Sequence, residues 1–173
     1  MSLFAPPRII ETEVFAAVPA RLRKNTMPAE RLASGGGAIT GGSFLEGPSF
    51  DRAGNLYVVD IPYGRIFRVS PKGDFDVAAE YDGEPNGLRI HKDGRIFVAD
   101  HKLGILLLDP ASGKVTPFIT RYHREHFKGL NDLTFDANGC PVMPGGTNSG
   151  VPTPSTTPST TINSPTATGS ASA

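Results

Sequence analysis

Residues 44–142 consist of short apolar runs separated by turns rich in glycine, proline, aspartate and asparagine. Runs such as 56–60 and 96–100 combine β-branched and aromatic residues over the length of a single strand. No window of 11 or more residues has an apolar period of 3.6, so few helices are expected. A short helix near 27–33, ahead of three glycines at 35–37, is the one exception. The pattern therefore predicts an all-β protein.

One pattern occurs three times, with a polar residue before a strand, then a glycine turn, then a second strand. These repeats cover residues 46–60, 86–100 and 131–142. Gly54, Gly94 and Gly139 occupy the same place in each repeat, at spacings of 40 and 45 residues. A period of that length is the size of one four-stranded blade of a β-propeller. Further strand-like runs complete the first two repeats, at 65–69, 75–81, 105–109 and 115–119.

The third repeat ends early, after strand signals at 133–135 and 140–142. We therefore expect residues 44–142 to form a partial β-propeller of about two and a half blades. An incomplete ring leaves blade faces exposed, so the sequence resembles the first half of a larger protein, with poor solubility expected. Residues 1–43 are expected to form an N-terminal segment with a strand near 8–18, because an N-terminal strand often completes the last blade of a closed ring.

Residues 143–173 form a third region of different composition. From residue 144 onward, 19 of 30 residues are Pro, Ser or Thr, and none is charged or aromatic. Such a segment buries too little apolar surface to offset about 1–2 kcal/mol of backbone entropy per residue. We expect this tail to be disordered.

Charge and cysteine content narrow the class of protein. Seventeen Lys and Arg residues balance 17 Asp and Glu residues, so no net positive field favours nucleic acid or an anionic membrane as a partner. One cysteine excludes a disulfide framework. The first 20 residues lack an apolar run typical of a signal peptide, and no window approaches the roughly 18 apolar residues of a membrane span. A cytoplasmic protein is expected.

The residue that opens each repeat carries a side-chain oxygen: Glu46, then Asn86, then Asn131. We refer to these three residues as the oxygen triad. Equivalent positions in a propeller lie at equivalent radius, so the triad is expected to converge near the axis. Carboxylate and amide oxygens suit a hard cation, Ca²⁺ first, with Mg²⁺ or Mn²⁺ as alternatives. The competing interpretation is that these are turn residues whose side chains bond their own backbone.

Other polar residues have simpler interpretations. Asp132 follows Asn131 and either reaches the same channel or points to solvent at a strand edge. Asp60 and Asp100 end strand runs, where closing the next turn is the expected role. His123 and His126 lie in a polar connection, where a solvated loop is favoured over a zinc site, and Cys140 is expected to be a small half-buried residue. The paired glycines at 41–42 and 145–146 lack the sequence context of a phosphate-binding loop.

Three runs of sequence resemble a known family. They are Phe-Leu-Glu46-Gly-Pro-Ser-Phe-Asp, Pro-Asn86-Gly-Leu-Arg-Ile-His-Lys-Asp-Gly and Lys-Gly-Leu-Asn131-Asp132-Leu. They are similar to the opening blades of the gluconolactonase, regucalcin (senescence marker protein) and lactonase family of six-bladed β-propellers. The resemblance covers about residues 8–142 and is specific over 44–136.

The resemblance implies roles for individual residues. Glu46 matches a metal-binding glutamate, and Asn131 matches a residue that contacts substrate or metal. Asp132 accompanies Asn131 as a substrate-binding residue and a weak candidate for catalysis, and Asn86 matches a channel position that varies. The family's later Asn-Gly ligand and its general-base Asp have no match in this sequence, so the catalytic base is unknown.

The function expected from these residues is metal-dependent hydrolysis of a small-molecule lactone or related cyclic ester. Because the family's base has no match, we interpret the chain as a truncated or misread version of such an enzyme, or a splice form, with doubtful activity of its own. The alternative is a non-catalytic β-propeller fragment that acts as a binding or scaffold module. A pure scaffold gives no reason for Glu, Asn and Asn at matching repeat positions.

Overall fold

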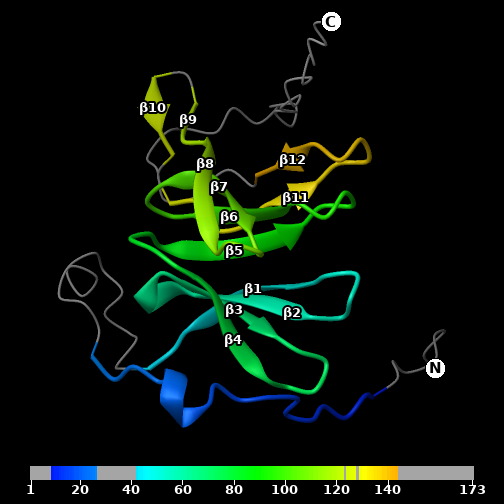
Figure 1. Cartoon of the computed structure of the whole chain (residues 1–173). Helices are drawn as coiled ribbons and strands as arrows, with labels where there is room; N and C mark the ends of the chain where they lie inside the picture. Colours follow the sequence, from blue (N-terminus) through cyan, green and yellow to red (C-terminus); the bar gives the residue numbers. More distant parts are fainter. Residues whose placement is uncertain (1–8, 27–41, 123, 128, 144–173) are drawn as a thin grey trace, which may run out of the picture.

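The computed structural model describes residues 9–26, 42–122, 124–127 and 129–143, and it is built almost entirely from antiparallel strands (Figure 1). Blade 1 is a four-stranded sheet of β1 (Leu45–Phe50), β2 (Leu56–Asp60), β3 (Arg65–Val69) and β4 (Phe75–Glu80). Blade 2 is a second such sheet of β5 (Pro85–Ile90), β6 (Ile96–Asp100), β7 (Gly104–Asp109) and β8 (Lys114–Ile119).

The remaining elements are short. Two hairpins follow blade 2: β9 (Arg121–Tyr122) with β10 (Glu125–His126), and β11 (Thr134–Phe135) with β12 (Pro141–Val142). Two 3₁₀ turns occur in the first half of the chain, η1 (Ala20–Leu22) and η2 (Ile61–Tyr63). The described residues thus form two complete blades and the first hairpin of a third, as the repeat pattern predicts.

The glycines that mark the repeat occupy equivalent turns. Gly54, Gly94 and Gly139 have φ of 82°, 94° and 83°, a left-handed conformation that costs glycine nothing because it has no Cβ. In each turn the glycine N–H donates to the carbonyl three residues earlier, at 3.1, 2.8 and 2.9 Å respectively. Sequence spacing therefore identifies the inner hairpin of every blade.

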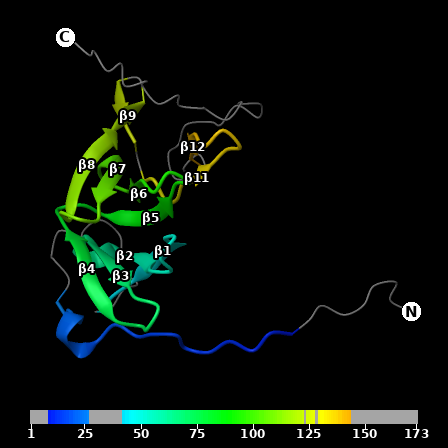
Figure 2. The same ribbon diagram turned by 45° about the vertical axis from the view of Figure 1, so that its right-hand side comes forward.

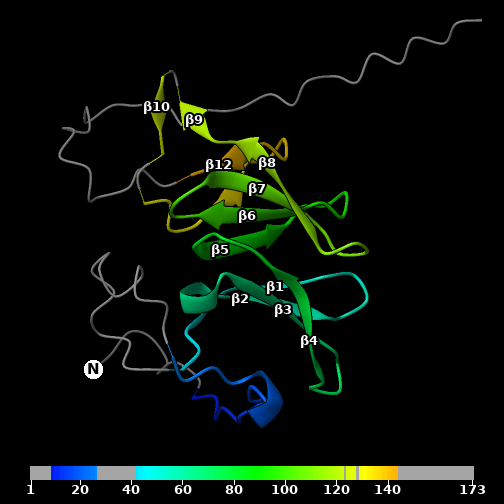
Figure 3. The same cartoon turned by 60° about the vertical axis from the view of Figure 1, so that its left-hand side comes forward.

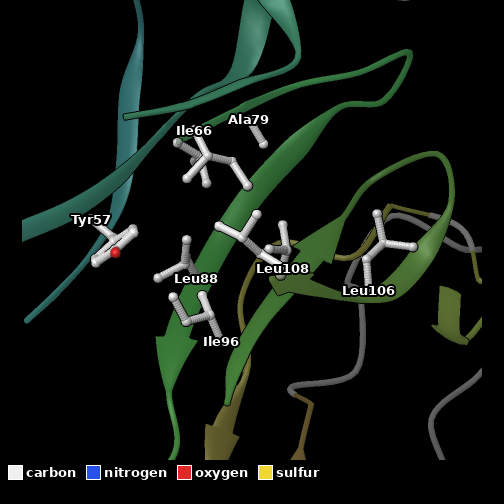
Figure 4. Close-up of a cluster of buried hydrophobic side chains, with 9 residues drawn as sticks. Tyr57, Ile66, Ala79, Leu88, Ile96, Leu106 and Leu108 are labelled. Carbon is white, nitrogen blue, oxygen red and sulfur yellow. The ribbon is translucent and has the colours of Figure 1, made fainter. Parts of the chain in front are cut away.

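The layers stack in chain order, with the N-terminal segment, blade 1, blade 2 and the β11–β12 hairpin following one another (Figure 1). Successive side chains of a strand point to opposite faces of the blade. Ile96 and Val98 pack toward blade 1, whereas Phe97 and Ala99 pack toward the β11–β12 hairpin. Figure 4 shows the core between blades 1 and 2. Its buried members are Tyr57, Val59, Ile66, Ala79, Leu88, Ile96, Val98, Leu106 and Leu108.

The N-terminal segment covers the outer face of blade 1, and it contains no strand. Residues 9–19 form no regular structure, which corrects the strand expected near 8–18. Ala16, Val18 and Leu22 pack on a core of blade-1 residues, and the Arg65 guanidinium donates to the Leu22 carbonyl at 2.8 Å. Apolar contacts and isolated side-chain bonds, rather than a β-ladder, hold this segment.

Two further expectations concern residues outside the described ranges, namely the helix near 27–33 and the disordered tail from 144. The structure adds one observation about membranes. Among the described residues, no helix has the length and hydropathy that crossing a bilayer would require.

Candidate functional site

The innermost strands of the blades lie in direct backbone contact because glycine occupies the crossing points (Figure 2). A Cβ placed on Gly47 of β1 would lie 2.5 Å from the backbone nitrogen of Leu88 in β5. A Cβ on Gly87 of β5 would lie 2.5 Å from Asp132 Oδ1 and 2.8 Å from the carbonyl oxygen of Asn131. Any larger residue would force these strands apart, so the two glycines set how closely the first three repeats approach.

These glycines directly follow Glu46 and Asn86, the first two members of the oxygen triad. The third member, Asn131, touches Gly87 through its own backbone. The triad thus stands on three successive inner segments that are packed one against the next.

Irregular strand pairing occurs beside two of the triad residues, Glu46 and Asn86. The register of β1 on β2 shifts between Glu46 and Ser49, and that of β5 on β6 shifts between Pro85 and Gly87. A bulge bends the strand and re-aims the side chain beside it. The same kind of irregularity at both positions indicates that these side chains are directed away from the ordinary pleat.

Buried aspartates fix the start of each inner strand. The backbone N–H of Phe44 donates to Asp60 Oδ1 at 2.9 Å, and the N–H of Glu84 donates to Asp100 Oδ2 at 2.8 Å. Both aspartates are fully buried. Since these bonds are made two residues before Glu46 and Asn86, they hold the strands that present the triad. The turn-closing role expected for Asp60 and Asp100 agrees with these contacts.

The triad side chains differ from these aspartates in having no partner among the described residues. Glu46 and Asn131 are exposed and Asn86 is partly exposed. Within the ranges that the structure describes, none of the three carboxylate or amide groups makes a side-chain hydrogen bond or ion pair. The alternative that Asn86 and Asn131 bond their own backbone is therefore not observed. Three accessible oxygen-bearing groups remain available to a ligand.

Asp132 has a different environment from Asn131. Its Oδ1 accepts the N–H of Leu133 at 2.8 Å, and its Oδ2 accepts Nη2 of Arg89 at 2.6 Å. Arg89 lies on β5, three residues after Asn86. Sequence reasoning missed this arginine. Aligning the repeats makes it the equivalent of Ser49 in the first blade, and so places it on an inner strand.

The other candidates lie away from the triad's strands. His126 belongs to the β9–β10 hairpin, so the polar connection expected there contains a short pair of strands, and Cys140 is half-buried as expected. In the described part of the chain, no group of three or more His, Cys, Asp or Glu side chains has the arrangement of a metal site. A metal site on this chain would therefore depend mainly on amide oxygens.

Comparison with known proteins agrees with the fold. The family model described as the SMP-30/Gluconolactonase/LRE-like region matches residues 44–153, which include both blades and the whole triad. The chain belongs to this family. The predicted resemblance to the SMP-30/gluconolactonase family, and the partial β-propeller expected from the repeats, are confirmed.

Individual curated proteins are similar to parts of this chain. Lactonase drp35 of Staphylococcus epidermidis is 30% identical over 103 residues, which cover 55% of this chain and 31% of the relative. Lactonase drp35 of Staphylococcus aureus (strain bovine RF122 / ET3-1) is 42% identical over 102 residues, with the same coverage. The protein Strictosidine synthase-like 10 of Arabidopsis thaliana is 29% identical over 154 residues, covering 78% of this chain and 37% of that protein.

A solved structure shares the family's fold with this chain. The gluconolactonase XC5397 of Xanthomonas campestris superposes with a TM-score of 0.55 at 22% identity, over 58% of this chain and 34% of that structure. The chain spans about a third of the length of the curated lactonases it matches. The activity of the complete relatives is therefore only a proposal for this chain.

Proposed function

We propose that this chain carries part of the metal and substrate site of a lactone hydrolase, at the triad formed by Glu46, Asn86 and Asn131. One observation supports this most directly. The three oxygen-bearing side chains stand on successive inner segments, each in backbone contact with the next, and none has a protein partner among the described residues. Other polar residues at matching repeat positions, Asp60 and Asp100, are buried and fully hydrogen-bonded. The lactonase relatives supply the reaction class.

The donor chemistry favours calcium. One carboxylate and two amide oxygens are hard ligands without thiolate or imidazole, the set that Ca²⁺ accepts, with Mg²⁺ and Mn²⁺ as alternatives. Glu46 would supply the only formal charge, and Asn86 and Asn131 the neutral oxygens. When bound at such a site, a divalent ion polarises a lactone carbonyl or lowers the pKa of a water molecule.

The chain's own residues would bind and orient the substrate. Asn131 can donate through Nδ2 as well as accept through Oδ1, so it can hold a ring oxygen or hydroxyl of a lactone beside Glu46. Asp132 was predicted to contact substrate as well, and its ion pair with Arg89 favours a supporting role. No residue of this chain is assigned as general base.

The scaffold alternative gives no reason for this arrangement. A module that binds proteins through its blade edges would tolerate apolar or turn residues at the triad positions. The bulges beside Glu46 and Asn86, and the glycines that bring the strands together, would then have no purpose beyond packing. The hydrolase proposal accounts for both features.

Isothermal titration of the full chain with Ca²⁺ tests the metal proposal. We expect one binding event whose affinity falls at least about tenfold in Glu46→Gln, since the amide removes the only charged ligand. Asn86→Ala and Asn131→Ala should each weaken binding less. Glu13→Gln, a change of the same chemistry at an exposed N-terminal position, is the control and should leave the titration unaltered. Absence of binding heat in the unmodified chain would disprove the metal site.

Hydrolysis is tested separately with glucono-δ-lactone as the probe and an indicator of acid release. We expect a rate above the spontaneous one that depends on added Ca²⁺ and falls in Glu46→Gln. Calcium binding without any acceleration would mean that this part of the family fold holds the ion but leaves the chemistry to other residues. A rate unaffected by Glu46→Gln would contradict the assignment of Glu46.

A further inference from the structure

An ion pair beside the oxygen triad connects β5, which lies between β1 and β6 in Figure 3, to the segment just before β11. Arg89 Nη2 lies 2.6 Å from Asp132 Oδ2, and Nη1 of the same guanidinium donates to the Leu88 carbonyl at 2.8 Å. Both side chains are partly exposed, 33% for Arg89 and 40% for Asp132. The guanidinium is therefore fixed at two points, one on its own strand and one on the next repeat.

Asp132 is also fixed at two points. Its Oδ1 accepts the N–H of Leu133, a residue that is buried in the core between blade 2 and the β11–β12 hairpin. The same oxygen lies against Gly87, where a Cβ would approach it to 2.5 Å. Because both carboxylate oxygens have donors, Asp132 is held against β5 and is poorly placed to serve as a free ligand.

The first and second blades are joined at the equivalent place. Ser49, forty residues before Arg89, accepts the N–H of Ile90 through its hydroxyl at 3.2 Å. Each blade therefore uses the same inner-strand position to hold the following inner strand. The second blade differs in using a charged pair, Arg89 with Asp132. Asn131 directly precedes Asp132 in the sequence.

We propose that Arg89 is a positioning residue, which fixes Asn131 by clamping the neighbouring carboxylate of Asp132 against β5. This inference rests on the proposed function, because Asn131 matters only if the triad binds a ligand. The Arg89–Asp132 clamp and the Gly87 contact together set the distance between the second and third inner strands, and therefore between Asn86 and Asn131. Asp132 acts through Asn131 and not as a ligand itself.

The test compares Arg89→Met with Arg68→Met. Arg68 forms a more exposed ion pair with Asp76 at 3.2 Å, between β3 and β4 on the outer part of blade 1, and serves as the control. In the full chain, we expect Arg89→Met to weaken Ca²⁺ binding about three- to tenfold, and Arg68→Met to leave it unchanged. The urea midpoints of the two variants should be similar, which separates positioning from a loss of stability.

A double-variant cycle tests whether Arg89 works through Asp132. Asp132→Asn should weaken Ca²⁺ binding as much as Arg89→Met does, and combining the two changes should add nothing further, because the clamp is already broken. Arg89→Lys, which retains a charge but not the two-point geometry, should restore part of the affinity. Additive losses in the double variant would overturn the clamp.

A measurement without metal keeps this proposal separate from the proposed function. In ¹H–¹⁵N spectra of the calcium-free chain, the side-chain amide of Asn131 should shift or broaden in Arg89→Met and remain unchanged in Arg68→Met. An unchanged Asn131 amide, or unchanged Ca²⁺ affinity while Glu46→Gln lowers it, would refute positioning and leave the metal site standing. A shifted amide with no calcium binding in any variant would retain the clamp and refute the proposed function.

Discussion

Blades 1 and 2 hold the same buried aspartate in two different ways. Asp60 at the end of β2 receives Nη2 and Nε of Arg65 on Oδ2, at 2.6 and 3.1 Å. Asp100 at the end of β6 receives four neutral donors, the hydroxyl of Tyr81 and the N–H groups of Glu84, Lys102 and Leu103, at 2.8–2.9 Å. One carboxylate is compensated by a charge and the other by dipoles.

The sequence after each aspartate explains the difference. Lys102 donates a backbone N–H to Asp100, whereas the equivalent residue of blade 1 is Pro62, which has no N–H. Blade 1 replaces the missing donors with Arg65, which pairs with Asp60 in the ladder at the place where Gly104 pairs with Asp100 in blade 2. The comparison shows that the repeat preserves a buried acceptor and the strand start it fixes, while the donors can come from any nearby group.

Arg65 also joins blade 1 to the N-terminal segment. Its Nη1 donates to the Leu22 carbonyl at 2.8 Å, and its guanidinium lies over the ring of Tyr63, 5.0 Å from the centroid. The hydroxyl of Tyr63 donates in turn to the Lys24 carbonyl at 2.7 Å. The arginine that pairs with Asp60 therefore also holds the N-terminal segment against blade 1. Among the described residues, the aspartate of blade 2 has no equivalent connection to that segment.

The largest expected effect is that of Arg65→Met. Methionine fills similar space but leaves the Asp60 carboxylate buried with one remaining donor, the N–H of Phe44. Breaking a buried ion pair on one side costs about 3–5 kcal/mol of unfolding free energy. Urea denaturation of the variant measures this loss. Arg68→Met, which removes a surface pair, should cost less than about 1 kcal/mol, and equal losses in the two variants would contradict the argument.

Asp100→Asn should have a smaller effect. The amide keeps one acceptor oxygen but presents N–H groups where the carboxylate accepted two donors, so at least one buried donor is left unsatisfied. The expected cost is about 1–3 kcal/mol in unfolding free energy. Urea denaturation beside Arg65→Met provides the comparison. A loss exceeding that of Arg65→Met would show that four neutral donors hold a carboxylate more strongly than one buried guanidinium does.

Tyr81→Phe sharpens the comparison further, since it removes one donor to Asp100 and leaves the three backbone donors in place. We expect a loss of about 0.5–1.5 kcal/mol, the net value of one hydrogen bond. The same denaturation experiment measures it, with Tyr57→Phe in the core between blades 1 and 2 as a control for removing a tyrosine hydroxyl. A loss as large as that of Asp100→Asn would mean that Tyr81 alone carries the site.

The smallest effect concerns the turns at the outer end of the inner hairpins. In blade 1, Asp51 caps its turn by accepting the backbone and side-chain N–H groups of Asn55, both at 2.8 Å. In blade 2 that position is His91, and Asp93 is the capping residue. Desolvation acts to raise the pKa of Asp93, but hydrogen bonds from Arg95 and His91 outweigh it and lower the pKa from 3.8 to about 2.

A carboxyl whose folded pKa lies below its unfolded value stabilises the fold above the unfolded pKa, and loses that contribution as the pH falls through the folded pKa. We therefore expect thermal melts of Asp93→Asn to be slightly less stable than the unmodified chain at pH 6, with the difference shrinking between about pH 4 and pH 2. The effect is small because Asp93 is 44% exposed. A difference that stays constant over this range would show that Asp93 acts through packing.

Sequence reasoning could predict the inner hairpins well but not the N-terminal segment. Gly54, Gly94 and Gly139 mark turns whose left-handed geometry only glycine adopts easily, so their spacing reports structure directly. Residues 9–19 have strand-like composition, yet whether they pair depends on finding a strand edge. In the structure Ala16 and Val18 pack on blade 1 through their side chains, and Ile9, Ile10 and Val14 are exposed. Composition cannot reveal which of these two outcomes occurs.

The site shows the same division. Matching repeat positions identified Glu46, Asn86 and Asn131 as one set. Their spacings are the same as those of the turn glycines, which places the three residues equivalently on successive blades. The Arg89–Asp132 pair could not be found that way, since its members are 43 residues apart and belong to different blades. Only the close approach at Gly87 brings them together.

The sequence by itself determined the all-β repeat, the strand and turn positions, and the polar residue that opens each inner strand, because strand alternation and glycine geometry are local properties. Tertiary structure alone decided which polar groups are saturated and which are available. Asp60, Asp100 and Asp132 carry side-chain oxygens as the triad does, but donors that the fold brings to them occupy these oxygens. Hydrogen-bond satisfaction depends on neighbours in space, and these come from strand pairing within a blade for Asp60 and from the approach of two repeats for Asp132.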